Sequence, residues 1–247
     1  MAQYRRLICI FLKMFKAYLK SYYASSPGFY FGCGAYKVEV SLKVYTIRPM
    51  DSGAKLITVT KSGIKPNPQF ARNGVANYNF DIALIKLSAE LPTSDYYLIG
   101  KVYTSTYQQY YNYNGPVTAV GWGRNSSAND ASSTLQKVDF KIGTKDECSG
   151  YWGSSKRDYD HVYQMCGVTP GKSVCKGDSG GPIVRYSSAH QTYLQVGISS
   201  FVPSSNGQAQ CEKGFAVFTR VSVHRDWIDR NSCLLNDGGF CPTWLSD

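Results

Sequence analysis

The stretch that decides the fold is Cys175-Lys176-Gly177-Asp178-Ser179-Gly180-Gly181-Pro182. A serine acts as a nucleophile when a sharp bend exposes its oxygen and points backbone amides at the developing oxyanion. Glycines on both sides of Ser179 allow that close approach. Taken alone, the stretch is also compatible with a glycine-rich turn that carries an incidental serine. The rest of the chain therefore has to separate these two interpretations.

The same letters satisfy Gly-x-Ser-x-Gly, the nucleophile elbow of α/β-hydrolases. That fold needs a helix directly after the serine, whereas Gly180-Gly181-Pro182-Ile183-Val184 begins a strand better than a helix. The chain also lacks the alternating strand and helix segments of an α/β protein. We therefore reject an α/β-hydrolase.

Short apolar or alternating runs, separated by turn signals, dominate the chain from residue 36 onward and are typical of β-barrels and sandwiches. Asn73-Gly74, Asn114-Gly115 and Asn206-Gly207 are such turn signals. The 20 tyrosines and 23 glycines also suit strands and tight turns. One terminal helix is expected at 223–231. The expected strands lie at 38–44, 56–60, 82–87, 117–120, 138–142, 183–186, 193–198 and 215–221.

The 247 residues carry a net charge of +10, from 27 basic and 17 acidic side chains. Such an excess raises nucleic acid or an anionic surface as a partner. Long Lys/Arg runs and an RNA-binding motif are missing, so we expect no nucleic-acid partner. No Cys-x-x-Cys pair is present, which argues against a zinc ribbon. We expect neither a metal nor a cofactor.

The first 35 residues form an atypical segment. Arg5 and Arg6 precede an apolar run that Lys13 interrupts, which makes a weak secretory signal. Apolar residues recur at helical spacing over 7–20 with lysines on the opposite face, which predicts a basic amphipathic helix able to lie on a membrane surface. A poor signal sequence or a wrongly predicted first exon are the plainer alternatives, and we favour them.

Five stretches, in order along the chain, resemble the chymotrypsin/trypsin family of serine peptidases. The stretch at 175–182 is similar to the family's active-site serine region, and Asp81 opens a run similar to the strand that carries its catalytic aspartate. The other three matches are Val120-Gly121-Trp122-Gly123, Val196-Gly197-Ile198-Ser199-Ser200-Phe201, and Phe218-Thr219-Arg220-Val221 followed by Asp226-Trp227-Ile228. Five ordered matches are far more specific than any one of them.

The resemblance implies an all-β fold of two six-stranded antiparallel Greek-key barrels with a short C-terminal helix. We expect the first barrel to be incomplete in this chain. The expected segments are an atypical N-terminal part at 1–35, a remnant of the first barrel at 36–115, the second barrel with its helix at 116–230, and a tail at 231–247.

The resemblance also implies a serine-type endopeptidase that works through an acyl-enzyme on a polypeptide substrate, with polypeptide inhibitors as further partners. Ser179 would be the nucleophile, and the backbone amides of Gly177 and Ser179 would form the oxyanion hole. Asp81 would hold a histidine in the right tautomer. Asp178 would pair with an N-terminal ammonium released by cleavage, which orders the oxyanion hole in the family.

The implied substrate pocket lies beside the serine, with Ser200 and Phe201 among its residues. Ser173 occupies the floor, where a trypsin-like enzyme carries an aspartate, so cleavage after Lys or Arg is not expected. Val202 and Ala216 match the two wall positions, and a valine narrows the pocket as in elastase-like members. We expect a small or medium apolar residue before the scissile bond.

The family orders its triad as histidine, aspartate, serine, and here the pattern breaks. All three histidines of the chain follow Asp81, namely His161, His190 and His224. Without an imidazole, Ser179 is a poor nucleophile at neutral pH. No Ile-Val-Gly-Gly activation sequence is present, so Asp178 would lack a buried partner and the oxyanion hole would be unformed.

We therefore expect the chain as written to be inactive. A truncated or wrongly assembled gene product is the favoured explanation, because missing first-barrel strands would expose sheet edges and apolar surface. The alternative is a non-catalytic protease homologue that uses the fold to bind peptides or proteins.

Eight cysteines indicate disulfides in an oxidising compartment, and the resemblance implies an extracellular or secreted protein. It also implies the pairs Cys148–Cys166 and Cys175–Cys211. A Cys233–Cys241 pair would close the tail, while Cys9 and Cys33 have no assigned partner. Asn125-Ser126-Ser127 is a glycosylation sequon, which has meaning only if the chain is secreted.

Overall fold

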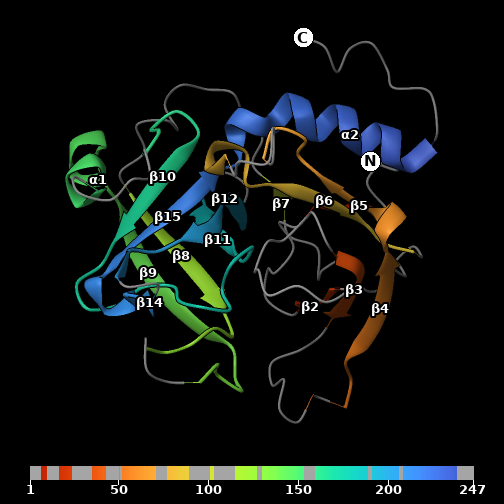
Figure 1. Ribbon diagram of the computed structural model, residues 1–247, viewed down its shortest axis with the longest axis horizontal. Coiled ribbons are helices and arrows are strands. Elements are labelled where there is room, and N and C mark those ends of the chain that lie inside the picture. Colours follow the sequence, from red (N-terminus) through yellow and green to blue (C-terminus); the bar gives the residue numbers. More distant parts are fainter. Residues whose placement is uncertain are drawn as a thin grey trace.

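The computed structural model is dominated by β-strands, which gather in two groups with one helix lying across them (Figure 1). Its description covers residues 7–9, 17–23, 35–42, 50, 52–70, 77–88, 101–102, 115–126, 130–152, 159–188, 191–205 and 208–237. The all-β fold class that the sequence predicts is confirmed.

Six strands of the C-terminal half close into an antiparallel barrel, which we call the ring. The strand order is β11-β8-β9-β10-β15-β12, and β12 pairs back onto β11. Each ring strand therefore has a hydrogen-bonded neighbour on both sides. The ring strands are β8 (Pro116–Gly121), β9 (Gln136–Ile142), β10 (Gln164–Val168), β11 (Pro182–Ser187), β12 (Thr192–Phe201) and β15 (Phe215–Arg220).

Shorter elements decorate the ring. β7 (Lys101–Val102) pairs in parallel with β12, and β13 (Ser204–Ser205) forms a hairpin with β14 (Gln208–Ala209). Helix α1 (Lys145–Trp152) follows β9, and helix α2 (Arg225–Asp237) follows β15 after a short 3-10 turn. The sequence predicts the terminal helix but not α1.

The N-terminal half consists of two three-stranded antiparallel sheets rather than a closed barrel, within the part of the chain that the structure describes. One sheet has the order β1-β6-β5 and the other β2-β3-β4. Their strands are β1 (Leu7–Cys9), β2 (Ala17–Tyr23), β3 (Ala35–Leu42), β4 (Lys55–Thr60), β5 (Ile64–Pro66) and β6 (Ala83–Lys86).

The amphipathic helix predicted at 7–20 is wrong wherever the structure describes that segment. Residues Leu7–Cys9 pair with β6, and residues Ala17–Tyr23 pair with β3 over the full length of β2. Helical spacing is a weak signal in so short a segment, and a neighbouring strand that offers a continuous hydrogen-bond ladder overrides it. The predicted membrane-binding helix therefore does not exist at these positions.

All eight strands expected from the sequence are confirmed, since each overlaps one of β3, β4, β6, β8, β9, β11, β12 and β15. The Asn206-Gly207 signal also agrees with the pairing of Ser205 with Gln208 in the β13–β14 hairpin. The signals at Asn73-Gly74 and Asn114 lie outside the described residues.

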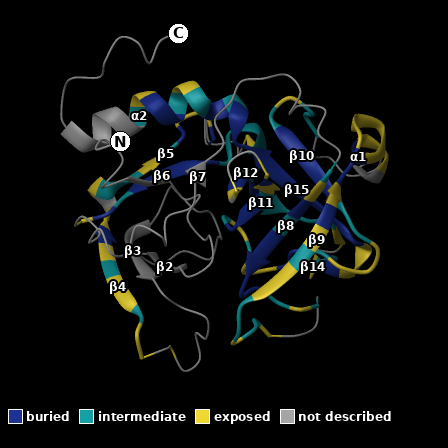
Figure 2. Ribbon diagram, turned by 180° about the vertical axis from the view of Figure 1, so that it is seen from behind, coloured by how far each residue is buried: buried dark blue, intermediate teal, exposed yellow. Residues whose placement is uncertain are grey.

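The main hydrophobic core fills the ring, where Ile183, Phe218 and Ala216 are fully buried (Figure 2). A second buried cluster joins the two halves. In it Ile82 and Leu84 of the N-terminal half pack against Ile198, Val221 and Ile228 of the C-terminal half. The strand that begins just after Asp81 is therefore anchored on the ring and on α2.

Candidate active site

The predicted nucleophile lies on a tight turn between Cys175 and β11. The Asp178 amide donates to the Cys175 carbonyl at 2.9 Å, and the Gly181 amide donates to the Asp178 carbonyl at 2.8 Å. Gly177 adopts a φ of +102°, in the left-handed region that disfavours side chains. Ser179 is exposed at this turn. The turn explains why glycines must flank the serine.

Two backbone hydrogen bonds fasten this turn to β12. The Gly180 amide donates to the Ser199 carbonyl, and the Ser199 amide donates to the Gly181 carbonyl, each at 2.8 Å. Ser199 is itself buried. The position of the exposed serine is therefore fixed by β12, one of the strands of the ring.

The Asp178 carboxylate, half-buried beneath the turn, accepts two backbone hydrogen bonds. They come from the Gly123 amide at 2.8 Å and from the Cys175 amide at 2.9 Å. A Cβ atom on Gly123 would collide with this carboxylate, so only glycine fits there. The expectation that Asp178 would lack a buried partner is wrong, because these two amides supply one.

The peptide between Lys176 and Gly177 is oriented by a third contact. The Lys176 carbonyl accepts a hydrogen bond from the Arg124 amide at 3.0 Å. Because the C=O and N–H of one trans peptide point in opposite directions, the Gly177 N–H points away from Arg124. That amide is one of the two donors that the sequence assigns to an oxyanion hole.

Asp81 reaches the same region from the N-terminal half. The Ser200 hydroxyl donates to Asp81 Oδ2 at 2.6 Å, and the Thr219 hydroxyl donates to the Asp81 carbonyl at 2.9 Å. Burial raises the pKa of the Asp81 carboxyl, and the hydrogen bond from Ser200 partly opposes that shift. A cation beside Asp81 would lower this pKa again and would itself be stabilised.

The turn that delivers Asp81 is held by a set of contacts centred on Asn79. Its side-chain amide donates to Asp160 Oδ2 at 3.0 Å, and its carbonyl lies 3.1 Å from His224 Nε2. The Asn79 backbone amide donates to Asn77 Oδ1 at 3.1 Å. These contacts join segments 81 and 145 residues apart. The 3-10 turn Tyr78–Phe80 is thereby locked onto the ring.

His224 is buried among side chains that support the fold. The imidazole of His224 is buried between the aromatic rings of Phe80 and Tyr163, with centroid distances of 5.8 and 6.0 Å. Burial lowers the pKa of His224 to about 4, so its imidazole is neutral near pH 7. A neutral ring whose Nε2 faces the Asn79 carbonyl carries its proton on Nε2 and donates it there. That nitrogen is committed to Asn79.

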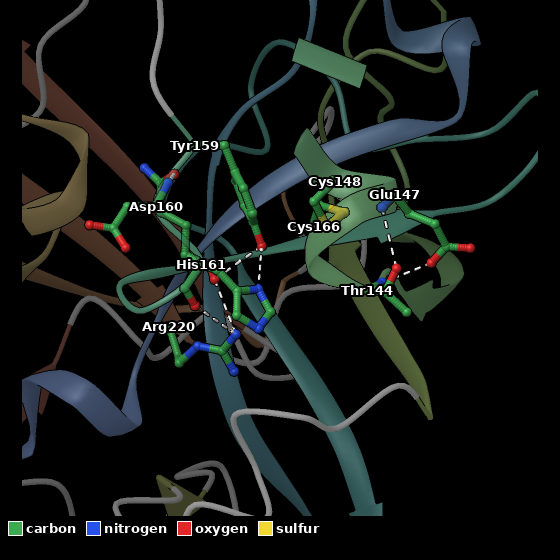
Figure 3. The surroundings of a disulfide bond; sticks show 9 residues. Thr144, Glu147, Cys148, Tyr159, Asp160, His161, Cys166 and Arg220 are labelled. Atoms are coloured by element: carbon green, nitrogen blue, oxygen red, sulfur yellow. Dashed lines mark hydrogen bonds between the residues drawn. A yellow bond between two sulfur atoms is a disulfide. The ribbon is translucent and has the colours of Figure 1, made fainter. Parts of the chain in front are cut away.

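His161 lies in the turn that precedes β10, near the Cys148–Cys166 disulfide (Figure 3). Its Nδ1 is 3.2 Å from the Tyr159 hydroxyl, and its carbonyl accepts a hydrogen bond from Arg220 at 3.3 Å. Burial and the nearby Arg220 lower the pKa of His161. The third histidine, His190, lies outside the described residues.

The predicted pocket residues lie on or beside strands β12 and β15 of the ring. The Ser173 hydroxyl donates to the carbonyl of Phe215, the residue before the fully buried Ala216. Val202 packs against the core cluster that contains Ala216. Phe201 makes an edge-to-face contact with Tyr78 at 5.3 Å between centroids, which adds an aromatic side chain that the sequence did not single out.

A cavity of about 260 Å³ borders the serine turn at Asp178. Asp178 and Ser173 line it, together with Gly121, Gly123 and Lys172, but Ser179, Asp81, Val202 and Ala216 do not. The cavity therefore belongs to the support of the turn, and the proposed position of the scissile bond lies outside it.

Two predicted disulfides are confirmed, Cys148–Cys166 and Cys175–Cys211. The second one anchors the serine turn to the segment before β15. Cys241 and Cys33 lie outside the described residues, so the Cys233–Cys241 pair stays a prediction.

The described part of the chain contains neither a metal-binding cluster nor a membrane-spanning helix. No group of three or more His, Cys, Asp or Glu side chains there could hold a metal ion. No helix there is both long and apolar enough to cross a bilayer.

Comparison with known proteins gives a match to the trypsin family model across residues 32–228. The chain belongs to the trypsin family.

Individual members of the trypsin family agree. Mast cell protease 2 of Ovis aries is 30% identical over 199 residues, which cover 80% of this chain and 71% of the relative. Chymotrypsin-like elastase family member 1 of Rattus norvegicus is 31% identical over 191 residues, covering 72% and 64%. Melanization protease 1 of Drosophila melanogaster is 31% identical over 170 residues, covering 67% and 41%. The chain thus spans about two fifths of that relative, and 54% of Drosophila serine protease 1.

Sequence reasoning missed several residues that support this trypsin-family site. Asn79, Asp160 and His224 fix the Asp81 turn, yet no local pattern announces contacts between such distant segments. Helix α1 did have a signal, because Thr144-Lys145-Asp146-Glu147 is a capping box. The Thr144 amide donates to Glu147 Oε2 at 2.8 Å, and the Glu147 amide donates to Thr144 Oγ1 at 3.2 Å.

Proposed function

We propose that this protein is a serine-type endopeptidase whose nucleophile is Ser179 and whose acid is Asp81. The observation that carries the proposal is the shared support on β12. Ser199 holds the Ser179 turn through its backbone, and Ser200, the next residue, holds the Asp81 carboxylate through its hydroxyl. A nucleophile and an acid held by successive residues of one strand suit a base that bridges them.

In this mechanism the Ser179 oxygen attacks the carbonyl carbon of a peptide, and an imidazole takes the hydroxyl proton. The negative oxygen that forms would accept hydrogen bonds from the amides of Gly177 and Ser179. One such donor is typically worth about 3 to 4 kcal/mol in the transition state. The imidazolium passes its proton to the leaving amine, and water then hydrolyses the acyl-enzyme. Asp81 stabilises the imidazolium.

The substrate of this site is a polypeptide, with a small or medium apolar side chain before the scissile bond. Ser173, Val202 and Ala216 support that preference, because none of them offers a carboxylate to a lysine or arginine. Ser200, Phe201 and the neighbouring Tyr78 ring would flank the substrate on the β12 side. The natural compartment is extracellular, in keeping with the disulfides Cys148–Cys166 and Cys175–Cys211.

We further propose that Ser179 is barely activated in the 247-residue chain. His224 faces the Asn79 carbonyl and His161 the Tyr159 hydroxyl, so neither ring lies on the Asp81 carboxylate. Neither of the two described histidines serves as the base, and a serine without a base keeps an ordinary hydroxyl pKa and reacts slowly.

Reaction of the purified, disulfide-intact chain with a fluorophosphonate probe tests both parts. We expect faint labelling of the chain alone and a clear increase when free imidazole is added, because the added base can accept the Ser179 hydroxyl proton. Peptide mass spectrometry should place the label on Ser179, and Ser179→Ala should abolish it. Asp81→Asn, which keeps the shape of the side chain, should remove most of the imidazole effect.

Each result has a distinct meaning. Full labelling without imidazole would contradict the claim of weak activation while supporting the endopeptidase. A folded chain that remains unlabelled at every imidazole concentration would contradict the endopeptidase itself. Near-native circular dichroism and intact disulfide mapping on the same sample separate that result from misfolding.

A non-catalytic homologue that binds polypeptides is the second candidate. The engagement of His161 and His224 with other partners favours it, since neither of these two described histidines lies at Ser179 or Asp81. This candidate predicts that a peptide binds equally well to the chain and to Ser179→Ala, with no cleavage and no labelling of either. Calorimetric titration with an apolar decapeptide measures the first part.

A further inference from the structure

The loop between β8 and β9 carries Asn125-Ser126-Ser127, the one Asn-x-Ser/Thr sequence in the 247 residues. This sequence is the acceptor signal for an N-linked oligosaccharide in a protein that passes through the secretory route. A motif of three letters occurs often by chance, so the structural setting of Asn125 decides whether it is usable; Ser127 lies outside the described residues.

The setting of Asn125 suits a glycan. The residue is exposed and comes directly after the isolated bridge between Arg124 and Ala131. The Ser132 amide donates to the Gly123 carbonyl at 3.1 Å, which closes the base of the loop. A glycan is bulky and hydrated, so the folded chain tolerates it only on a side chain that reaches solvent. Asn125 meets that condition without any change in the ring.

Asn231 provides an internal contrast. It opens Asn231-Ser232-Cys233, which differs from the acceptor signal by a cysteine in the third position. Its side-chain amide donates to the Trp227 carbonyl at 2.7 Å within helix α2. Attachment of a sugar to that nitrogen would break the contact with the helix backbone. Asn231 is therefore a natural negative control for Asn125.

The disulfides supply an independent argument about compartment. Cys148–Cys166 and Cys175–Cys211 form in oxidising surroundings, which is where oligosaccharides are attached to asparagine. From these observations we propose that Asn125 is N-glycosylated and that its glycan shields the Arg124–Asn125 peptide bond from external proteases.

The covalent step needs a polyprenyl-diphosphate-linked oligosaccharide as the donor. The Asn125 Nδ2 atom bonds to the anomeric carbon of the first sugar, and the bond from that carbon to the diphosphate oxygen breaks. The lipid diphosphate leaves with the electron pair, and the amide nitrogen gives up one proton to the transferase. No oxidant or reductant takes part.

The shielding follows from adjacency. Arg124 is half-exposed and is the kind of residue after which trypsin-like proteases cut. A sugar on the next side chain fills the space that such a protease needs on the far side of the scissile bond. Asn125 and Asp178 line the same cavity, so the first sugar stands near the support of the serine turn.

The test is secretion of the full chain from cultured animal cells behind a cleavable leader, with analysis of the protein in the medium. We expect a heavier band that peptide-N-glycosidase reduces to the unmodified mass. Deglycosylation in heavy-oxygen water should convert residue 125 to labelled aspartate. Asn125→Gln should abolish the heavier band, and Asn231→Gln should leave it unchanged.

Protein recovered from the medium with an unmodified Asn125 would overturn the proposal. If little is secreted, translation into microsomes gives a protease-protected fraction that is read in the same way. The mass spectrum of the wild-type chain decides the matter even where a variant fails to fold.

Limited digestion with external trypsin tests the shielding. We expect cleavage after Arg124 to be several-fold slower in the glycosylated chain than in the enzymatically deglycosylated chain. Cleavage after the exposed Lys213 should be equal in both and serves as the internal standard. Equal rates after Arg124 would contradict the shielding. Neither experiment depends on the chemistry of Ser179, so its outcome is separate from that of the proposed function.

Discussion

The two halves of the molecule differ in whether their sheets close. In the ring, every strand has two neighbours, and the core cluster around Ile183 and Phe218 is enclosed by hydrogen-bonded backbone. The sheets β1-β6-β5 and β2-β3-β4 each have edge strands within the described residues. The N-terminal half nevertheless delivers Asp81, and the contacts that hold Asp81 come from the ring.

This difference shows where the site obtains its rigidity. Ser200 and Thr219 bind the acid itself, and Leu84 just beyond it packs on Ile198 and Val221. The N-terminal half thus supplies the acid, while the C-terminal half positions it. We expect the two halves to unfold together for that reason, although their sheets are separate.

The largest expected effect comes from truncation of the two cores. Phe218→Ala should lower the free energy of unfolding by about 3 to 5 kcal/mol, and Leu84→Ala by about 2 to 5 kcal/mol, since both side chains are fully buried. Urea unfolding followed by circular dichroism and by tryptophan fluorescence should give coincident transitions for both variants. Trp122, which is buried in the C-terminal half, is one of the fluorescent reporters.

An exposed leucine in the N-terminal half supplies the control. Leu56 is 58% exposed, so Leu56→Ala should change the free energy of unfolding by no more than about 0.5 kcal/mol. Two separate transitions for Leu84→Ala, with the fluorescence change left at the wild-type midpoint, would show that the halves unfold independently.

The two disulfides both lie in the C-terminal half, so they allow two covalent links within that half to be compared with each other. Their cysteines are 36 residues apart in Cys175–Cys211 and 18 apart in Cys148–Cys166. From loop entropy alone, replacement of each pair by alanine should cost about 4 and about 3 kcal/mol respectively. Thermal unfolding of the two double variants measures the order, and a larger loss from the Cys148–Cys166 pair would contradict the loop-entropy account.

The contact between the halves at His224 predicts a pH dependence. Its pKa falls from 6.5 to about 4 on folding. Above about pH 6.5 both states carry a neutral ring, so its contribution is fully present. As the pH falls from about 6.5 to 4, the unfolded chain binds a proton that the folded chain refuses. Stability should decline by about 3 kcal/mol over this window and then level off.

A glutamine at this position separates His224 from other titrating groups. The folded pKa of His161 is also lowered, which gives a slope of the same sign, while the raised pKa of Asp81 gives the opposite sign above pH 3.8. In His224→Gln the side chain can still donate to the Asn79 carbonyl, but it does not titrate. The substitution should therefore flatten the dependence of unfolding free energy on pH, measured by urea unfolding between pH 4 and 7. His161→Gln is the matched comparison. An unchanged curve for His224→Gln would mean that His224 does not titrate differently in the two states.

Much of the C-terminal half could be predicted from the sequence, for a physical reason. Strands such as 117–120 and 215–220 are predominantly apolar runs that follow turn residues, so local pattern and final environment agree. The glycines around Ser179 likewise require a special backbone, which the φ of Gly177 bears out. Where a residue type is dictated by its own backbone, the sequence is sufficient.

The failures arose where distant segments decide. Residues 7–20 have a helical spacing of apolar side chains, yet pairing with β3 and β6 makes strands of the described parts. Asp178 was predicted to lack a buried partner in this chain, whereas the backbone amides of Gly123 and Cys175 donate to it, and no sequence pattern identified those two donors. The role of Asn79 is not visible in the sequence because its partners, Asp160 and His224, lie 81 and 145 residues away.

One consequence of β12 concerns motion. Ser199 and Ser200 are consecutive residues, so the spacing between the serine turn and the acid is set by a single link of covalent backbone. If the two halves moved slowly relative to each other, the hydrogen bond from Ser200 would make the Asp81 carboxylate move together with β12. Distortion would then appear at the outer sheets first, and the distance across which a proton must travel would be among the last dimensions of the molecule to change.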